Sequence, residues 1–204
     1  MRRGGANPEA VCQAWVDAGV RLLQLRAKSL ASGEMLGLAE RLVSRTRAAG
    51  ARFIVNDRLD VALLAAADGV HVGQEDLAPS AIDRVLARRS PRPALVVGLS
   101  THNDAQLRAG LDQPVSYLAI GPVFATTTKA RPDPVVGLEG VRRAAALSTP
   151  RRVPLVAIGG IDKSNARAVI EAGASAVVIA GALTGDDPGR RASALLEAVR
   201  STQA

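Results

Sequence analysis

Polar and charged side chains that suit phosphate chemistry follow short apolar runs in the first part of the sequence. They are Gln24, Arg26, Lys28, Asn56, Asp57 and Asp76. Arginine and lysine bind phosphate oxygens, and Mg²⁺ commonly binds through one or two carboxylates together with substrate phosphates. Asp57 and Asp76 therefore predict a Mg²⁺ site that a phosphorylated substrate completes. The chain has one cysteine and two histidines, so a zinc site built from a Cys/His cluster is not expected.

The stretch GPVFATTTKARPD, residues 121–133, offers hydroxyl groups and cations where another apolar run ends. Thr126 and Thr128 supply hydroxyls, and Lys129 supplies a positive charge. Ser100 ends an earlier apolar run and adds a further hydroxyl. Hydroxyl and ammonium groups donate hydrogen bonds to phosphate oxygens, so these residues extend the predicted binding site.

Two glycine-containing turns near the C-terminus predict a second phosphate site. The segment PLVAIGG ends in Gly159 and Gly160, and AVVIAG ends in Ala180 and Gly181. Because glycine lacks a Cβ, its backbone N–H group can approach a ligand closely. In barrel enzymes the last two loops of this kind frequently bind a phosphate. We therefore expect two phosphate-binding groups, one assisted by metal and one formed by the backbone.

The elements that position these residues alternate between strand and helix, which predicts an α/β fold in a single domain over 1–204. Near-continuous apolar runs predict buried parallel strands at 21–26, 52–57, 69–73, 95–100, 117–124, 154–160 and 176–183. Helices are predicted at 8–18, 32–49, 58–66, 79–89, 103–111, 138–147, 163–172 and 189–201. Since each strand of a TIM (β/α)8 barrel precedes a helix, the series predicts such a barrel without its first strand at the N-terminus. An open sheet is the alternative, and Gln24 and Arg26 would also suit the interior of a barrel.

Composition and charge exclude several other classes. The net charge is +7, but the arginines are scattered and aromatic residues make up only 2%, whereas single-strand nucleic-acid binders need stacking rings. No apolar run reaches the roughly 18 residues of a membrane span, and the N-terminus lacks the apolar core of a signal peptide. Cys12 lies in a helical apolar pattern and is expected in the core. We expect a cytoplasmic protein whose partners are small phosphorylated molecules and which binds neither nucleic acid nor membranes. A homo-oligomer is possible on this sequence.

Several candidate residues also have purely structural interpretations. Asp57 and Ser100 are residue types that cap helix N-termini. His71 lies inside an apolar strand pattern, which is typical of a core histidine. His102 fits a loop or helix start, although proton transfer by its ring is also open.

Five motifs occur in order along the chain: QLRAK, VNDRLDVALLAAADGVHVGQEDL, VGLSTH, YLAIGPVFATTTK and AIGGI. From about Ala10 to about Ala182 the chain resembles thiamine-phosphate synthase, in the thiamine-phosphate synthase/thiazole tautomerase superfamily. The resemblance implies a TIM-barrel transferase. Its pyrimidine substrate, 4-amino-5-hydroxymethyl-2-methylpyrimidine diphosphate, loses diphosphate in a Mg²⁺-assisted dissociative step. The nitrogen of thiazole phosphate, or of its carboxylated form, then attacks the exposed carbon to give thiamine monophosphate.

The resemblance also implies a role for each matching residue. Contacts to the diphosphate or the pyrimidine are implied for Gln24, Arg26, Lys28, Asn56, Ser100 and Lys129. Catalysis, as stabilisation of the leaving diphosphate, is implied for Arg26, Lys28, Ser100 and Lys129. Mg²⁺ ligands are implied at Asp57 and Asp76. Contacts to the thiazole phosphate are implied for Thr126, Thr128, Gly160, Ala180 and Gly181.

Two other functions fit parts of the pattern. A thiazole tautomerase of the same superfamily would carry a histidine acid/base near Pro122, where this chain has none. A phosphate-binding barrel without catalysis would fit the missing strand. The sequence also departs from the family pattern at Gly181, where a serine is usual, and at Ala125, where proline is common.

Overall fold

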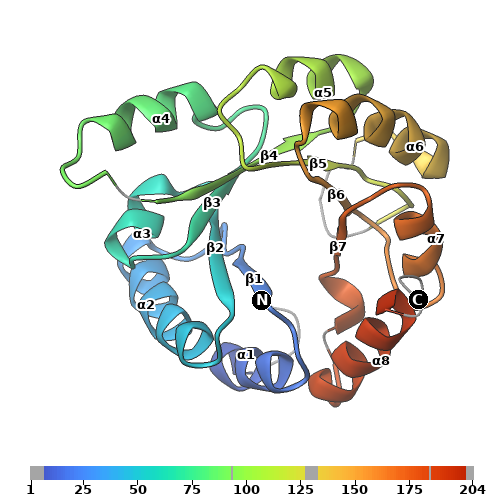
Figure 1. Cartoon of the computed structure of the whole chain (residues 1–204). Coiled ribbons are helices and arrows are strands. Elements are labelled where there is room, and N and C mark those ends of the chain that lie inside the picture. The colour runs from blue at the N-terminus through green and yellow to red at the C-terminus, as the bar shows by residue number, and fades with distance from the viewer. Residues whose placement is uncertain (1–6, 93, 127–132, 184, 201–204) are drawn as a thin grey trace. The chain divides into compact units, whose positions relative to one another are not determined.

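The computed structural model describes residues 7–92, 94–126, 133–183 and 185–200, along which strands and helices alternate (Figure 1). The described residues fall into two compact units. One contains those of 1–97 together with 185–193, and the other contains those of 98–184 together with 194–204. The prediction of a single domain stays a prediction, which a two-state unfolding test would address.

The first unit is built on parallel strands. Its elements are α1 (Pro8–Asp17), β1 (Leu22–Leu25), α2 (Ser32–Ala48), β2 (Arg52–Asn56), α3 (Leu59–Leu64), β3 (Gly69–Val72) and α4 (Pro79–Ala87). Leu23 pairs with Phe53 and Val55 with Val70, so β1, β2 and β3 run in the same direction. Phe53, Val55 and Val70 are almost completely buried, as expected for a parallel sheet covered on both faces.

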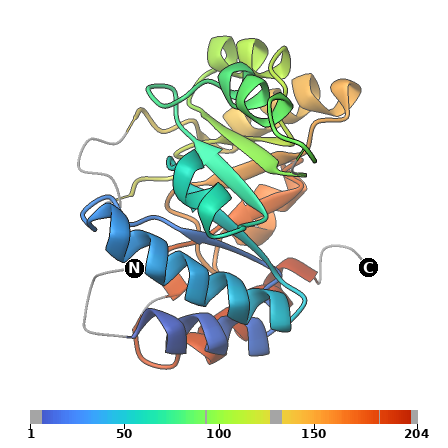
Figure 2. The ribbon, with the colours of Figure 1, turned by 90° about the vertical axis from the view of Figure 1, so that its left-hand side faces the viewer.

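Helices α1 and α2 pack side by side in the first unit (Figure 2). Asn7 begins α1 by accepting a hydrogen bond from the Glu9 N–H, and Pro8 occupies the first helical position. The Glu9 carboxylate then binds Arg41 and Arg45 of α2, at 2.7 Å and 2.9 Å. Cys12 is buried in α1, which confirms its predicted place in the core.

The second unit repeats the alternation of strand and helix. The boundary between the units falls within β4 (Val96–Thr101), and α8 (Pro188–Arg200) contributes residues to both. The other elements are α5 (Asp104–Leu111), β5 (Tyr117–Ile120), α6 (Gly137–Ser148), a 3₁₀ turn (Thr149–Arg151), β6 (Leu155–Ile158), α7 (Ala166–Glu171), β7 (Ala176–Val178) and a second 3₁₀ turn (Gly181–Leu183). Leu118 pairs with Leu155 and Ala157 with Val177, again in parallel.

The number and order of elements agree with the sequence prediction, but several strands end earlier than predicted. The strand predicted over 117–124 ends at Ile120, and the one over 154–160 ends at Ile158 because Gly159 and Gly160 have φ values of 101° and 64°. The strand predicted over 176–183 ends at Val178, and the residues from Gly181 form a 3₁₀ turn. In the described part of the chain, α1 is the first element and no strand precedes it.

Every helix in the described ranges is too short or too polar to cross a membrane.

The glycine at the start of β3 predicts a large difference between two alanine substitutions. A Cβ on Gly69 would collide with the Val96 carbonyl oxygen and would lie 2.5 Å from Ile54 Cδ1, whereas a Cβ on Gly33 in α2 would have no neighbour within 4 Å. We expect Gly69→Ala to lower the free energy of unfolding by about 1–3 kcal/mol. Gly33→Ala is the matched control and should raise it by about 0.5 kcal/mol, since alanine favours the helix. Urea unfolding measures both, and equal effects would contradict the packing described for β3.

Candidate active site

The carboxyl ends of β1, β2 and β3 bring the first group of predicted residues to one edge of the sheet. Gln24 lies within β1, half-buried and opposite Ile54, and Arg26 and Lys28 follow that strand with exposed side chains. Asn56 ends β2 and is buried, at 8% exposure. Because the strands are parallel and in register, the residues that follow them lie at the same edge. The structure therefore places these residues in or just after the carboxyl ends of β1 and β2.

Asp57 is held in an unusual backbone conformation at this edge. Its φ is 65°, in the left-handed region, and its N–H donates to the His71 carbonyl oxygen at 2.7 Å. This region costs a non-glycine residue about 1 kcal/mol or more, although aspartate and asparagine tolerate it best. The Asp57 carboxylate lies 3.0 Å from Lys28 Nζ. Arg58, not Asp57, occupies the N-cap position of α3, so the alternative of a helix cap is not adopted.

Asp76 is the second carboxylate of this edge. Its Oδ2 accepts a hydrogen bond from the Gly73 N–H at 2.8 Å, just after β3. Burial raises the pKa of the Asp76 carboxyl, and the neighbouring Asp57 carboxylate raises it further, while the Gly73 hydrogen bond acts in the opposite direction. The edge thus holds two acids of which one is difficult to ionise, and a bound cation would favour the ionised form of both.

Two carboxylates, those of Asp57 and Asp76, are candidates for holding a cation at this edge. Within the described residues there is no group of three or more His, Cys, Asp or Glu side chains that could enclose a metal ion. Mg²⁺ is commonly bound by one or two carboxylates, with substrate phosphates and water completing its octahedral shell. Asp57 and Asp76 would supply the protein ligands of such a site.

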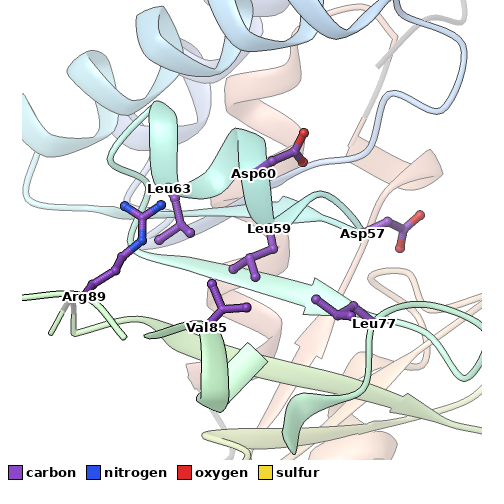
Figure 3. A pocket seen from close by; sticks show the side chains of 7 residues that line it. All are labelled: Asp57, Leu59, Asp60, Leu63, Leu77, Val85 and Arg89. Atoms are coloured by element: carbon purple, nitrogen blue, oxygen red, sulfur yellow. The ribbon is translucent and has the colours of Figure 1, made fainter. Parts of the chain in front are cut away.

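A cavity of about 390 Å³ lies beside Asp57, between α3 and α4 (Figure 3). Leu59 and Leu63 of α3 point toward Val85 of α4, whereas Asp57 lies at the margin of this apolar cluster. A surface that consists mainly of leucine and valine does not suit a diphosphate. The cavity is therefore a gap in the packing of two helices, and the residues predicted to bind phosphate lie at the strand ends.

The other predicted site residues belong to the second unit and lie in β4, after β5, after β6 and after β7. Ser100 lies within β4 and pairs in register with Ala119, so it is a strand residue and not a helix cap. Thr126 is half-buried. Thr128 and Lys129 lie outside the described residues. Ala180 and Gly181 are exposed after β7.

Gly160 is required by a close approach of two backbone segments. The N–H groups of Val123 and Phe124 donate to the carbonyl oxygens of Ile158 and Gly159, at 2.9 Å and 3.0 Å. A Cβ on Gly160 would lie 2.6 Å from the Ala125 carbonyl oxygen. The glycine pair therefore holds the start of the 121–133 stretch against the end of β6, and this packing by itself accounts for a glycine at position 160.

One contact of this unit was not predicted from the sequence. The ring of His102, which follows β4, lies 3.5 Å from the Asp133 carboxylate through its Nε2 atom. The aspartate that closes the stretch GPVFATTTKARPD was the available signal, but nothing in the spacing of the two residues indicates their contact. His71, by contrast, is buried within β3 as predicted.

Comparison with known proteins decides the relationship of the chain. The sequence profile of a family described as "Thiamine monophosphate synthase" matches residues 2–183. The chain belongs to this family. A member from Koribacter versatilis, thiamine-phosphate synthase, is 46% identical over 187 residues, which cover 91% of this chain and 83% of the relative. Another from Thermus thermophilus is 43% identical over 180 residues, covering 88% and 82% of the two chains.

The solved structures agree with this membership. Thiamine phosphate pyrophosphorylase from Pyrococcus furiosus aligns with a TM-score of 0.86 and 29% sequence identity, over 97% of this chain and 92% of that one. The predicted fold class, an α/β fold of the TIM-barrel type, is thereby confirmed. The relatives of the chain are thus transferases of thiamine biosynthesis.

The raised pKa of Asp76 makes a prediction about stability. A carboxyl whose pKa is raised in the folded protein adds stability while it is protonated, and this stability is lost as the pH rises through the raised pKa. Asp76→Asn should therefore raise the melting temperature of the metal-free protein at neutral pH, by about 1–3 °C because water screens part of the repulsion. The gain should vanish at acidic pH, where Asp76 is protonated in the wild type.

Thermal unfolding with and without Mg²⁺ plus inorganic diphosphate completes this test. The two ligands together should stabilise the wild type and should not stabilise Asp76→Asn. Asp83→Asn is a suitable control, because Asp83 is an exposed carboxylate on α4 that pairs with Arg92. If Mg²⁺ and diphosphate stabilised Asp76→Asn as much as Asp83→Asn, Asp76 would not be a metal ligand.

Proposed function

We propose that the chain is a thiamine-phosphate synthase. It couples 4-amino-5-hydroxymethyl-2-methylpyrimidine diphosphate with thiazole phosphate and releases thiamine monophosphate and diphosphate. With the carboxylated form of thiazole phosphate, carbon dioxide is released as well. The 46% identity to a relative of that name, over 91% of this chain, is the observation that carries the proposal. The grouping of Lys28, Asp57 and Asp76 at one sheet edge supports it from the structure.

The coupling of the pyrimidine to thiazole phosphate moves no proton and needs no protein nucleophile. The bond between the pyrimidine methylene carbon and the diphosphate oxygen breaks, and the electron pair leaves with the diphosphate. The thiazole nitrogen then donates its lone pair to the carbon. Negative charge grows only on the departing oxygens, so fixed cations accelerate the reaction by stabilising charge that develops in the transition state.

The residues of the first unit would bind the diphosphate. Lys28 pairs with Asp57 at 3.0 Å, and the exposed lysine could turn its ammonium group toward phosphate oxygens when Asp57 binds the metal. Arg26 would add a second cation, while Gln24 and the buried Asn56 would donate amide hydrogens. Bound Mg²⁺ would supply Lewis-acid stabilisation of the leaving diphosphate.

The residues of the second unit would bind phosphate through hydroxyls and the backbone. Thr126, Thr128, Gly160, Ala180 and Gly181 are the proposed contacts of the thiazole phosphate. Ser100 and Lys129 are the proposed contacts of the departing diphosphate.

The remaining expectations are proposals of the same kind. We propose Mg²⁺ as the cofactor, small phosphorylated molecules as the partners and the cytoplasm as the location. Nucleic-acid binding is not proposed, because the arginines are scattered and the chain has few aromatic residues. The names of the relatives favour the synthase over a thiazole tautomerase.

Substitution of Asp57 tests the metal site with the fold preserved. Asparagine tolerates the left-handed conformation of this position, so Asp57→Asn should fold normally while it loses a charged Mg²⁺ ligand. We expect thiamine monophosphate formation from the two purified precursors to fall about 100- to 1,000-fold. Asp60→Asn is the control, since Asp60 is an exposed carboxylate three residues along the chain that pairs with Arg58. A near wild-type rate in Asp57→Asn would refute the metal assignment, and an inactive wild type would refute the proposed function.

Lys129 tests the division between the two substrates. Lys129→Ala should weaken binding of the pyrimidine diphosphate about tenfold or more, because an ammonium group contributes more to a diphosphate than to a distant monophosphate. Binding of thiazole phosphate should change little. Calorimetric titration of each ligand measures both effects, and equal losses would show that Lys129 does not discriminate between the substrates.

A further inference from the structure

The turn that follows β6 leaves backbone donors unpaired beside a proposed phosphate contact. Within the described residues, the N–H groups of Gly160 and Ile161 form no hydrogen bond. Ile161 is only 5% exposed, and buried backbone N–H groups are nearly always paired. Successive N–H groups in a turn commonly form a concave site for an anion. The unpaired donors therefore point to an acceptor that comes from outside the chain.

The carbonyl oxygens of the same two peptide units are both held by other groups of the second unit. The Gly159 carbonyl oxygen accepts a hydrogen bond from the Phe124 N–H, at 3.0 Å. The Gly160 carbonyl oxygen accepts one from Nδ2 of Asn165, also at 3.0 Å. In a trans peptide the C=O and N–H bonds point in opposite directions. The amide of Asn165, by holding the Gly160 carbonyl, therefore also fixes the direction of the Ile161 N–H.

The amide of Asn165 is itself fixed by two contacts of opposite kind. Its Oδ1 accepts a hydrogen bond from the Asp162 N–H at 2.9 Å, while its Nδ2 donates to Gly160. A backbone N–H only donates and a carbonyl oxygen only accepts, so the amide cannot be reversed without the loss of both hydrogen bonds. The half-buried side chain thus spans the turn from Gly160 to Asp162.

The carboxylate of this turn is held separately from the Asn165 amide. Oδ1 of Asp162 accepts hydrogen bonds from the Ser164 N–H and the Ser164 hydroxyl, at 2.8 Å and 2.6 Å. Ser164 and Asn165 therefore hold different groups of Asp162, the side chain and the backbone. This separation allows the link to Gly160 to be tested without disturbing the other contact.

We propose that Asn165 is a positioning residue of the synthase, which holds the peptide between Gly160 and Ile161 so that the Ile161 N–H donates to the phosphate of thiazole phosphate. The proposal rests on the proposed function, in which Gly160 is a contact of this phosphate. Both polar atoms of the Asn165 amide are engaged within the turn, so the residue acts through the backbone and not on the reacting atoms. Its loss should raise KM for thiazole phosphate and leave kcat nearly unchanged.

Three variants separate this role from packing and from general support of the turn. Asn165→Ala removes both hydrogen bonds and leaves space. Asn165→Leu removes the same bonds but fills the space, so it shows whether packing alone matters. Ser164→Ala is the matched control, because it removes the hydroxyl contact with the Asp162 carboxylate and leaves the link from Asn165 to Gly160 in place.

Calorimetric titration is the first measurement. We expect Asn165→Ala and Asn165→Leu to bind thiazole phosphate about three- to tenfold more weakly than the wild type, and Ser164→Ala to bind it equally well. Binding of inorganic diphosphate with Mg²⁺ should be the same in all three variants, since other residues are proposed to hold it. Wild-type affinity for thiazole phosphate in either Asn165 variant, or equal losses for both ligands, would overturn the proposal.

The second measurement uses the wild type alone, so it does not depend on how well a variant folds. Saturation with thiazole phosphate should move the Ile161 amide proton downfield in nitrogen-15 correlated NMR spectra, and should slow its exchange with water. The amide of Ala144, a buried residue in the middle of α6, is the reference and should not respond. An Ile161 signal that stays in place at saturation would refute the proposal.

The same spectra distinguish this proposal from the proposed function. If the wild type formed no thiamine monophosphate but its Ile161 amide responded to thiazole phosphate, the proposed function would fail and the phosphate contact would stand. If thiamine monophosphate formed while the Ile161 amide remained silent, the function would stand and the role of Asn165 would fail.

Discussion

The candidate site of the first unit depends on two carboxylates that are held near each other at the edge of a parallel sheet. Strand pairing alone brings Asp57 and Asp76 to this edge, and each is then fixed by a backbone hydrogen bond, from Asp57 to His71 and from Gly73 to Asp76. The like charges oppose one another, which is one reason why the pKa of Asp76 is raised. A divalent cation would relieve this repulsion. In the proposed site, the affinity for Mg²⁺ would increase when a substrate brings phosphate oxygens to complete the coordination shell.

The phosphate contacts proposed for the second unit would act by different physical means. Several of them are glycines or alanine, which offer only backbone groups, whereas those proposed for the first unit carry charged or amide side chains. Backbone N–H groups have a fixed geometry and no net charge, so they suit a phosphate that stays bound through the reaction. Mobile cations and metal ligands suit a diphosphate that must leave. The division of residue types between the two units thus matches the two fates of phosphate in the proposed reaction.

Much of this organisation could be predicted from the sequence because it depends on local patterns. Apolar runs of four to eight residues marked each strand, and the residues following β1, β2 and β3 were expected at one edge because parallel strands leave no other arrangement. Strand ends were harder to predict. Val123 and Phe124 are apolar and continue the sequence pattern of β5. However, the strand has ended before them, and their backbone N–H groups donate to the carbonyl oxygens of Ile158 and Gly159. Tertiary hydrogen bonds decide this boundary, and they leave no local trace.

The contacts that the sequence could not reveal are those made by single side chains across long separations. The positive φ of Asp57 follows from its hydrogen bond to β3, and the pairing of His102 with Asp133 follows from the path of the chain after β5. The latter bears on the open role of His102. A general acid or base needs a ring nitrogen free to exchange a proton with substrate, but here Nδ1 is committed to Gly121 and Nε2 faces Asp133. The coupling of the proposed pyrimidine and thiazole phosphate moves no proton and would not require such a group. The two contacts of the ring, with Gly121 and Asp133, explain the histidine as a structural link within the second unit.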